Sequence, residues 1–169
     1  MAVLNPDHLL DQARQLTTLA GPGAPRQADL RRAISGAYYA LFHAILTQTA
    51  DVLVGRKNRD SPRYKLVYRS VPHAAIRAVC ENIIKPQLPI RYVPYEPRGG
   101  FGPDLVAVAT AFIELYEKRH LADYDPLYHV TRSDAELATG TSATALDLFR
   151  NANPVARNVF LYLAVFSPR

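Results

Sequence analysis

Three residues whose side chains can carry out chemistry share one face of a helix in the first third of the chain. Arg32, Tyr39 and His43 are seven and four residues apart. At 3.6 residues per turn, these spacings place the three side chains within about 40° of one another. A guanidinium matches the geometry of a phosphate, and an imidazole exchanges protons near neutral pH. The face could therefore bind and process a phosphate-containing ligand.

A second face of the same segment predicts that the helix packs in a core. Its apolar residues recur at steps of three and four, which is the spacing of a buried helical stripe. Gly36 lies in the row of the polar residues and would let another helix approach closely. The pattern predicts one long helix over residues 27–54, a length that suits an antiparallel bundle. The stripe consists of Leu30, Ile34, Ala37, Tyr38, Leu41 and Ile45.

A further candidate, Arg119, continues the apolar stripe of a helix predicted over residues 103–125. An arginine on an inward face needs a partner, and Asp123 is within reach four residues later. One interpretation is structural: a buried Arg119–Asp123 pair, braced by Tyr39 and His43, would fix the register of the helices. The other interpretation makes these residues part of a functional site.

Two short segments resemble HEPN-domain proteins. Residues 37–43, Ala-Tyr-Tyr-Ala-Leu-Phe-His, are similar to a run in the second HEPN helix. Residues 119–124 resemble the Arg-x-x-Ala-Asp-Tyr segment of one HEPN subgroup. The resemblance implies an all-α fold, an up-down helical bundle that forms one HEPN-like domain over residues 1–169. It also implies a homodimer and a metal-independent endoribonuclease of bacterial toxin–antitoxin or defence systems.

The resemblance also implies roles for individual residues. In HEPN ribonucleases, an arginine is followed by four to six residues and then by a histidine. The histidine handles the proton of the ribose 2′-hydroxyl, while the arginine stabilises phosphate charge. This chain departs from that pattern, because Tyr124 stands five residues after Arg119. His43 could supply an imidazole from the neighbouring helix. The candidate catalytic residues are therefore Arg119, His43 and Tyr124, and the binding or bracing residues are Arg32, Tyr39 and Asp123.

Positive charge is concentrated in the middle of the chain. Residues 55–98 hold ten of the twenty Lys and Arg residues and three acids, whereas the remainder carries slightly more acids than bases. Such a region suggests a surface that faces a polyanion. The alternative is a solvated loop whose charges keep it soluble. A helix is predicted from Pro72 to Lys85, so the basic segment 55–103 is expected to contain one helix and a Pro/Gly-rich loop.

The loop of residues 86–103 combines aromatic and cationic side chains among many turn formers. Single-stranded RNA is bound in this way, since bases stack on rings and phosphates pair with arginine. The alternative is that the prolines fix an extended cover over the core and the tyrosines pack beneath it. The candidate RNA-binding residues here are Arg91, Tyr92, Tyr95 and Arg98.

Other boundaries follow from local signals. A helix is expected to begin at Asn5-Pro6-Asp7 and to end in the turn Gly21-Pro22-Gly23. A capping box at residues 133–136 predicts the start of another helix. Asn153-Pro154 restarts the helical pattern, and the apolar run 159–166 is expected to be buried in the bundle or in a subunit interface.

The composition restricts the protein class. The 169 residues suffice for one domain, and the single Cys80 excludes a disulfide framework. No signal-peptide pattern or membrane-spanning apolar run is present, so a cytoplasmic protein without membrane contact is expected. The five histidines show no metal-ligand spacing. We therefore expect neither a metal nor another cofactor.

Two functions of different class remain. The first is an RNA- or nucleotide-binding homodimer with metal-independent endoribonuclease activity. The second is a non-catalytic interaction protein that partners a nucleotidyltransferase or another protein, a role that the family resemblance also implies. Salt-dependent RNA affinity would favour the first function. A tight protein partner without RNA affinity would favour the second.

Overall fold

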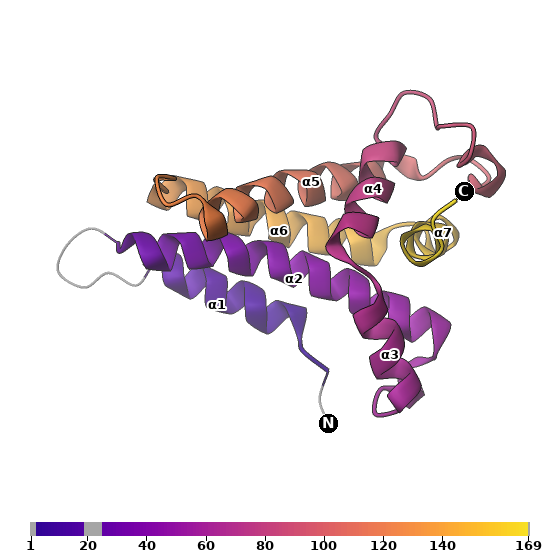
Figure 1. The fold of residues 1–169 in the computed structure, drawn as a ribbon, viewed down its shortest axis with the longest axis horizontal. Coiled ribbons are helices and arrows are strands. Elements are labelled where there is room, and N and C mark those ends of the chain that lie inside the picture. Colours follow the sequence, from indigo (N-terminus) through magenta and orange to yellow (C-terminus); the bar gives the residue numbers. More distant parts are fainter. Residues whose placement is uncertain (1–2, 19–24, 169) are drawn as a thin grey trace.

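The computed structural model describes residues 3–18 and 25–168, and within these ranges it contains seven α-helices, two short 3₁₀ turns and no strand. The predicted all-α class is confirmed. The central helix is α2 (Gln27–Leu53), which packs against α1 (Pro6–Thr18), α5 (Gly102–Tyr124) and α6 (Arg132–Asn151). These four helices run alternately up and down (Figure 1). The turn predicted at Gly21-Pro22-Gly23 lies outside the described residues.

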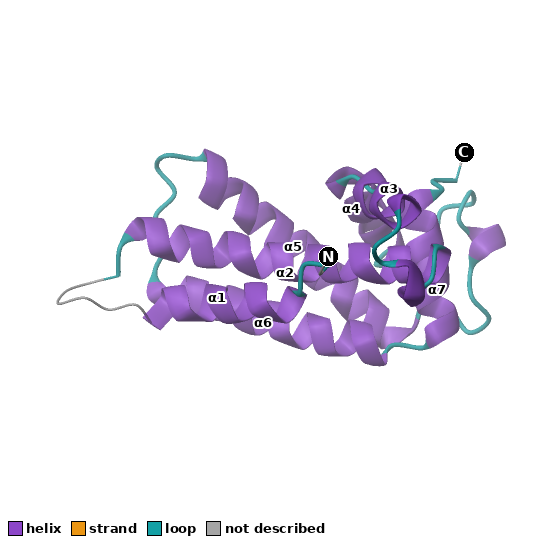
Figure 2. Ribbon diagram, turned by 90° about the horizontal axis from the view of Figure 1, so that it is seen from below, coloured by secondary structure: helices purple, strands orange, loops and turns teal. Residues whose placement is uncertain are grey.

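Three shorter helices gather where α2 ends. They are α3 (Pro62–Ser70), α4 (His73–Ile83) and α7 (Pro154–Val165). In Figure 1 they lie on the right, and α7 is seen nearly end-on, so it crosses the end of the bundle. Figure 2 shows the same two regions, with the long helices on one side and the short ones at the end of α2. No helix among the described residues is long and apolar enough to cross a membrane.

The buried stripe of α2 is confirmed, since each of its six predicted residues is at most 2% exposed. Gly36 has the predicted effect on helix packing. A Cβ atom at this position would lie 3.0 Å from the Cβ of Ala13 on α1. The missing side chain therefore allows α1 and α2 to approach closely.

The helix starts follow the predicted signals with one correction. The side chain of Asn5 accepts a hydrogen bond from the backbone N–H of Asp7 at 3.0 Å, and Asn153 caps α7 in the same manner. The capping box of α6 lies two residues before the predicted one, because Thr131 is the cap and Asp134 closes the box. Val130 directly before it is fully buried. This buried side chain fixes where the chain enters the helix.

The basic segment 55–103 contains two α-helices, so the prediction of one helix is wrong. The missed helix is α3, in which Ser61 accepts a hydrogen bond from the backbone N–H of Tyr64 at 3.1 Å and Pro62 occupies the first turn. Tyr64 is the one fully buried residue of this helix. A helix that buries a single side chain shows no apolar stripe in its sequence.

Comparison of two glycine substitutions tests the close packing of α1 and α2. In a helix, Gly→Ala favours folding by up to about 1 kcal/mol. We expect Gly140→Ala in α6 to be stabilising, since nothing lies within 4 Å of the added Cβ. Gly36→Ala should be less stable than Gly140→Ala by at least about 1 kcal/mol, because α1 must move. Equal free energies of unfolding in urea would contradict this packing.

Candidate functional site

Arg119 bridges α5 to α2. Its side chain is 12% exposed, and its Nε lies 2.8 Å from Oδ2 of Asp123. Its NH2 group donates a hydrogen bond of 2.7 Å to the hydroxyl of Tyr39 on α2. Ser35, also on α2, donates its hydroxyl to the second carboxylate oxygen of Asp123. Both members of the ion pair are thus tied to the same neighbouring helix.

Three aromatic rings surround the Arg119 guanidinium. Its central carbon lies 5.7 Å from the ring centre of Tyr38, 5.3 Å from that of Tyr39 and 5.5 Å from that of Tyr124. Tyr38 is fully buried, whereas Tyr124 is 64% exposed. The Nε proton is buried and does not point along the contact with Asp123, so it makes no hydrogen bond. These contacts favour the structural interpretation, in which the pair fixes the two helices against each other.

The structure places His43 against Tyr68 of α3 rather than against Arg119. Its Nδ1 lies 2.7 Å from the Tyr68 hydroxyl, and the ring of Tyr39 stands beside it with centres 6.0 Å apart. A second imidazole, His73, makes a similar bond of 2.5 Å to the hydroxyl of Tyr38. Burial lowers the pKa of both histidines, and Arg119 lowers that of His73 further. Both rings are therefore neutral at neutral pH, and each shares one hydrogen bond with a tyrosine hydroxyl.

Arg32 is exposed on α2 and takes no part in the Arg119 contacts described above. The adjacent Arg31 instead donates to the backbone oxygens of Pro126 and Tyr128 and ties the loop after α5 to α2. One residue along a helix turns the side chain by about 100°. This rotation separates the two arginines.

The four candidates in the loop between α4 and α5 do not form a shared stacking surface. Tyr92 is 3% exposed and packs in the core, with the guanidinium of Arg91 5.5 Å from its ring centre. Tyr95 is 53% exposed and lines a cleft against α7. Arg98 is also exposed. The alternative that tyrosine packs beneath the loop therefore holds for Tyr92 and not for Tyr95.

A different basic and aromatic surface is formed by α3 and the adjoining part of α2. A cleft of about 240 Å³ lies there. Tyr64 and Tyr68 are four residues apart on α3, with ring centres 6.4 Å from each other. This helical spacing is visible in the sequence, although no apolar stripe marks the segment as a helix. The cleft is lined by His43, Arg59, Tyr64, Lys65, Tyr68 and Arg69, together with Val3 and Leu4.

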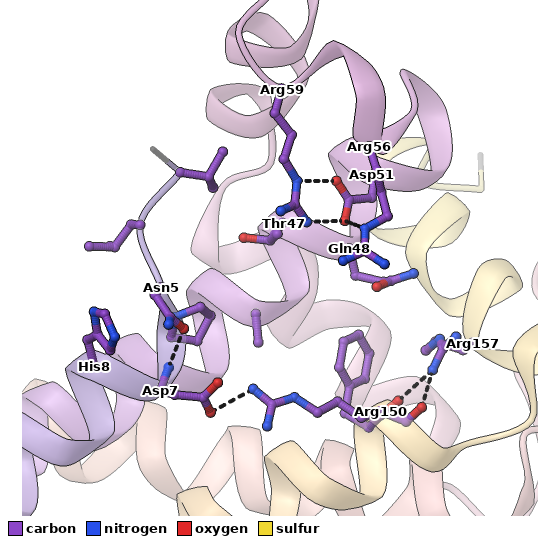
Figure 3. Close-up of a pocket in the computed structure, with 15 residues that line it drawn as sticks. Asn5, Asp7, His8, Thr47, Gln48, Asp51, Arg56, Arg59, Arg150 and Arg157 are labelled. Atoms are coloured by element: carbon purple, nitrogen blue, oxygen red, sulfur yellow. Dashed lines mark hydrogen bonds and ion pairs between the residues drawn. The ribbon is translucent and has the colours of Figure 1, made fainter. Parts of the chain in front are cut away.

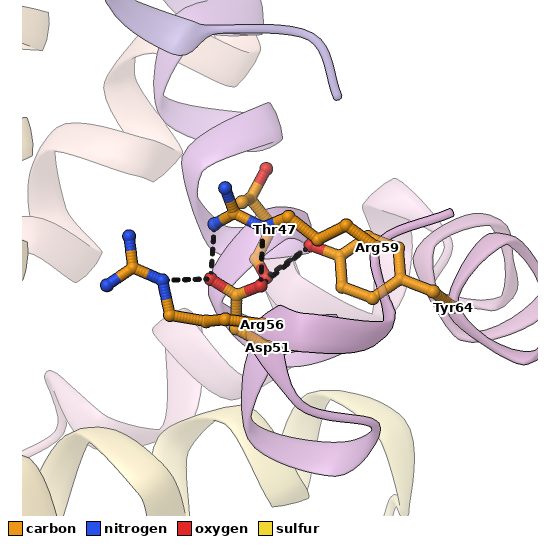
Figure 4. A network of polar contacts seen from close by, with 5 residues as sticks. All are labelled: Thr47, Asp51, Arg56, Arg59 and Tyr64. Carbon is orange, nitrogen blue, oxygen red and sulfur yellow. Dashed lines mark hydrogen bonds and ion pairs between the residues drawn. The ribbon is translucent and has the colours of Figure 1, made fainter. Parts of the chain in front are cut away.

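Asp51 anchors this surface to α2 (Figure 4). Its side chain is 7% exposed, and its two oxygens accept hydrogen bonds of 2.9 and 2.6 Å from Arg59. The hydroxyl of Tyr64 donates to the same carboxylate at 2.9 Å, and Arg56 lies 3.7 Å away. Burial and the bond to Asp51 raise the pKa of Tyr64 to about 12. The phenol therefore stays protonated and keeps donating.

The charge around α3 is strongly positive. Residues 55–70 hold six Lys or Arg residues and one acid. Basic side chains clustered on one surface raise the local concentration of anionic ligands. The exposed members are Arg56, Lys57, Arg63, Lys65 and Arg69.

The chain was compared with known protein families, curated proteins and solved structures. No protein-family model, no curated protein and no solved structure matches the chain. In the part of the chain that the structure describes, no group of three or more His, Cys, Asp or Glu side chains could hold a metal ion. The functional argument therefore rests on the contacts and charges themselves.

Substitution of Arg119 tests its bridging role. We expect Arg119→Ala to lower the free energy of unfolding by about 3 kcal/mol, because the partly buried Asp123 loses its partner. The matched control is Lys118→Ala, which breaks the surface pair with Glu114 and should cost less than about 0.5 kcal/mol. Both values come from urea denaturation. An Arg119 variant as stable as the Lys118 variant would refute the bridge.

The neutral histidines predict a loss of stability on acidification. Their folded-state pKa values lie below the unfolded value of about 6.5. The unfolded chain therefore binds more protons as the pH falls through this value, and the free energy of unfolding decreases. His73→Gln can still form a hydrogen bond with Tyr38 and should reduce the slope between about pH 7.5 and 5.5. A parent protein whose stability is constant over this range would contradict the assignment.

Proposed function

We propose that this protein binds single-stranded RNA through the surface formed by α3 and the adjoining part of α2. The observation that carries the proposal is the cleft in which Tyr68 and His43 stand beside Arg59, Lys65 and Arg69. Rings of this kind stack on unpaired bases, and neighbouring cations pair with the phosphates of the same strand. The cluster of positive charge around α3 would attract the strand from solution.

We propose a structural role for Arg119 in the same protein. Its guanidinium is occupied by Tyr39 and Asp123, and the nearby imidazoles are bonded to tyrosines. A metal-independent ribonuclease of the HEPN type needs an imidazole that can move a proton at the ribose. We therefore expect the protein to bind RNA at the α3 surface and not to cleave it at the Arg119 cluster. RNA as the ligand also agrees with what the resemblance of residues 37–43 and 119–124 to HEPN proteins implies.

One observation supports the second candidate function, a protein-interaction role. A cleft of about 670 Å³ beside α7 is lined by apolar residues, among which Tyr95 is 53% and Phe166 65% exposed. Exposed apolar groups of this kind often contact another protein. A second copy of the chain or a nucleotidyltransferase would be such a partner. RNA affinity separates the two functions, because this cleft lies outside the basic surface.

The proposal predicts how RNA affinity depends on α3. Lys65→Ala combined with Arg69→Ala should weaken binding of a fluorescent oligoadenylate, since two phosphate contacts are lost. The slope of log affinity against log salt should fall in magnitude by about 1.4, since each phosphate contact with a single strand contributes about 0.7. Fluorescence anisotropy over a range of salt concentrations measures both effects.

The matched control is Arg132→Ala, which removes an exposed arginine at the other end of α2. The side chain of Gln27 at the start of α2 is hydrogen-bonded to Val130, next to this position. Arg132→Ala should keep the salt slope of the parent protein. An α3 double variant with the parent's affinity and slope would refute the proposed surface. The oligonucleotide should also be recovered intact from EDTA, and its cleavage would refute the non-catalytic assignment.

A further inference from the structure

A second cavity, of about 600 Å³, adjoins the cleft on α3 (Figure 3). It lies among the start of α1, the end of α2, the 3₁₀ turn Arg56–Asn58, the end of α6 and the start of α7. Arg59 lines both this cavity and the cleft. A ligand could therefore extend from one into the other. The volume is in the range of small-molecule sites.

The charged groups of the cavity are unbalanced. Arg56, Arg59, Arg150 and Arg157 line it, whereas the acidic side chains are Asp7 and Asp51. Three of the arginines form ion pairs, Arg59 with Asp51 at 2.6 Å, Arg56 with the same carboxylate at 3.7 Å and Arg150 with Asp7 at 2.7 Å. Figure 3 shows these pairs on opposite sides of the cavity. Four guanidinium groups and two carboxylates leave an excess of two positive charges, which matches a phosphate monoester dianion.

Arg157 is the member of the set without a carboxylate. Its NH1 group donates to the backbone oxygens of Phe149 and Arg150 at 3.1 and 2.6 Å. Within the described residues it forms no ion pair, and its Nε is buried without a hydrogen-bond partner. A buried charged donor that lacks an acceptor is costly. The Nε atom has almost no exposed surface, so a phosphate in the cavity would accept its hydrogen bond from the second terminal nitrogen of Arg157, since guanidinium groups pair with phosphate oxygens.

The start of α1 contributes to the same wall. Asn5, Pro6, Asp7 and His8 line the cavity, and α1 is a helix of 13 residues. The positive end of its dipole adds to the field of the arginines. Asp7 opposes an anion here, but its pair with Arg150 offsets that charge.

We propose that this cavity binds a terminal phosphate monoester, carried by the end of an RNA strand or by a free nucleotide. The RNA form of this inference rests on the RNA binding proposed above, since the strand would run from the cavity over Arg59 into the cleft on α3. The free-nucleotide form does not depend on it.

Two matched pairs of ligands test the inference on the full chain. The first pair is a short oligoadenylate with and without a terminal phosphate, which is tested at the 5′ end and at the 3′ end. Its binding is measured by fluorescence anisotropy. The second pair is AMP and adenosine, measured by calorimetry. We expect the phosphorylated member of at least one pair to bind at least about tenfold more tightly. The pair that shows this preference identifies the source of the phosphate. Equal affinities within both pairs would overturn the inference.

Variants locate the preference in the cavity. Arg157→Gln should abolish it, whereas Lys65→Ala should weaken both oligoadenylates equally and leave their ratio unchanged. If circular dichroism shows that Arg157→Gln is unfolded, Arg56→Gln replaces it, because the Arg56 side chain is 79% exposed. A preference that survives in the folded variant would overturn the cavity assignment. Absence of RNA binding together with a preference for AMP would refute the proposed RNA function and leave this inference standing.

Discussion

The buried carboxylate of Asp51 holds the basic end of the molecule together. It receives two hydrogen bonds from Arg59 and one from Tyr64, so the 3₁₀ turn and α3 are fixed to the last turns of α2. The same contacts orient Arg59 between the cleft on α3 and the cavity beside α1. A negative group in this position offsets part of the repulsion among the surrounding arginines and lysines. It also leaves enough positive charge to attract an anionic ligand.

A second polar bridge, at Arg119, contacts α2 nearer its start, at Ser35 and Tyr39, and stabilises the bundle in this account. It is an ion pair within α5, whose two members are each hydrogen-bonded to a side chain of α2, and the rings of three tyrosines surround its guanidinium. Such a network specifies one packing of the helices, since any other register would break the hydrogen bonds that Tyr39 and Ser35 make with the pair. In this account, Arg119, Asp123 and Tyr39 stabilise the bundle, although their side-chain types suggest a functional site. The exposed positive charges lie instead on the shorter helix α3.

Much of the fold could be predicted from the sequence, because α2 and α5 bury long stripes and the starts of α1, α6 and α7 carry side-chain caps. The Arg119–Asp123 contact was also predictable from its spacing of four residues. The α3 surface was not, because a short helix that buries Tyr64 alone has no periodic pattern. The partner of His43 was missed for the same reason, since Tyr68 belongs to that helix. The cavity beside α1 is lined by residues from five segments that are far apart in the sequence. No local sequence pattern predicts that these segments lie together.

The central claim is that the α3 end, and not the Arg119 cluster, receives the ligand. Backbone amide chemical shifts recorded by NMR, with and without a phosphorylated oligoadenylate, test this claim directly. The account predicts shift changes in α3, in the last turns of α2 and at the start of α7. Changes confined to the surroundings of Arg119 and Tyr124 would contradict it and restore that cluster as the binding site.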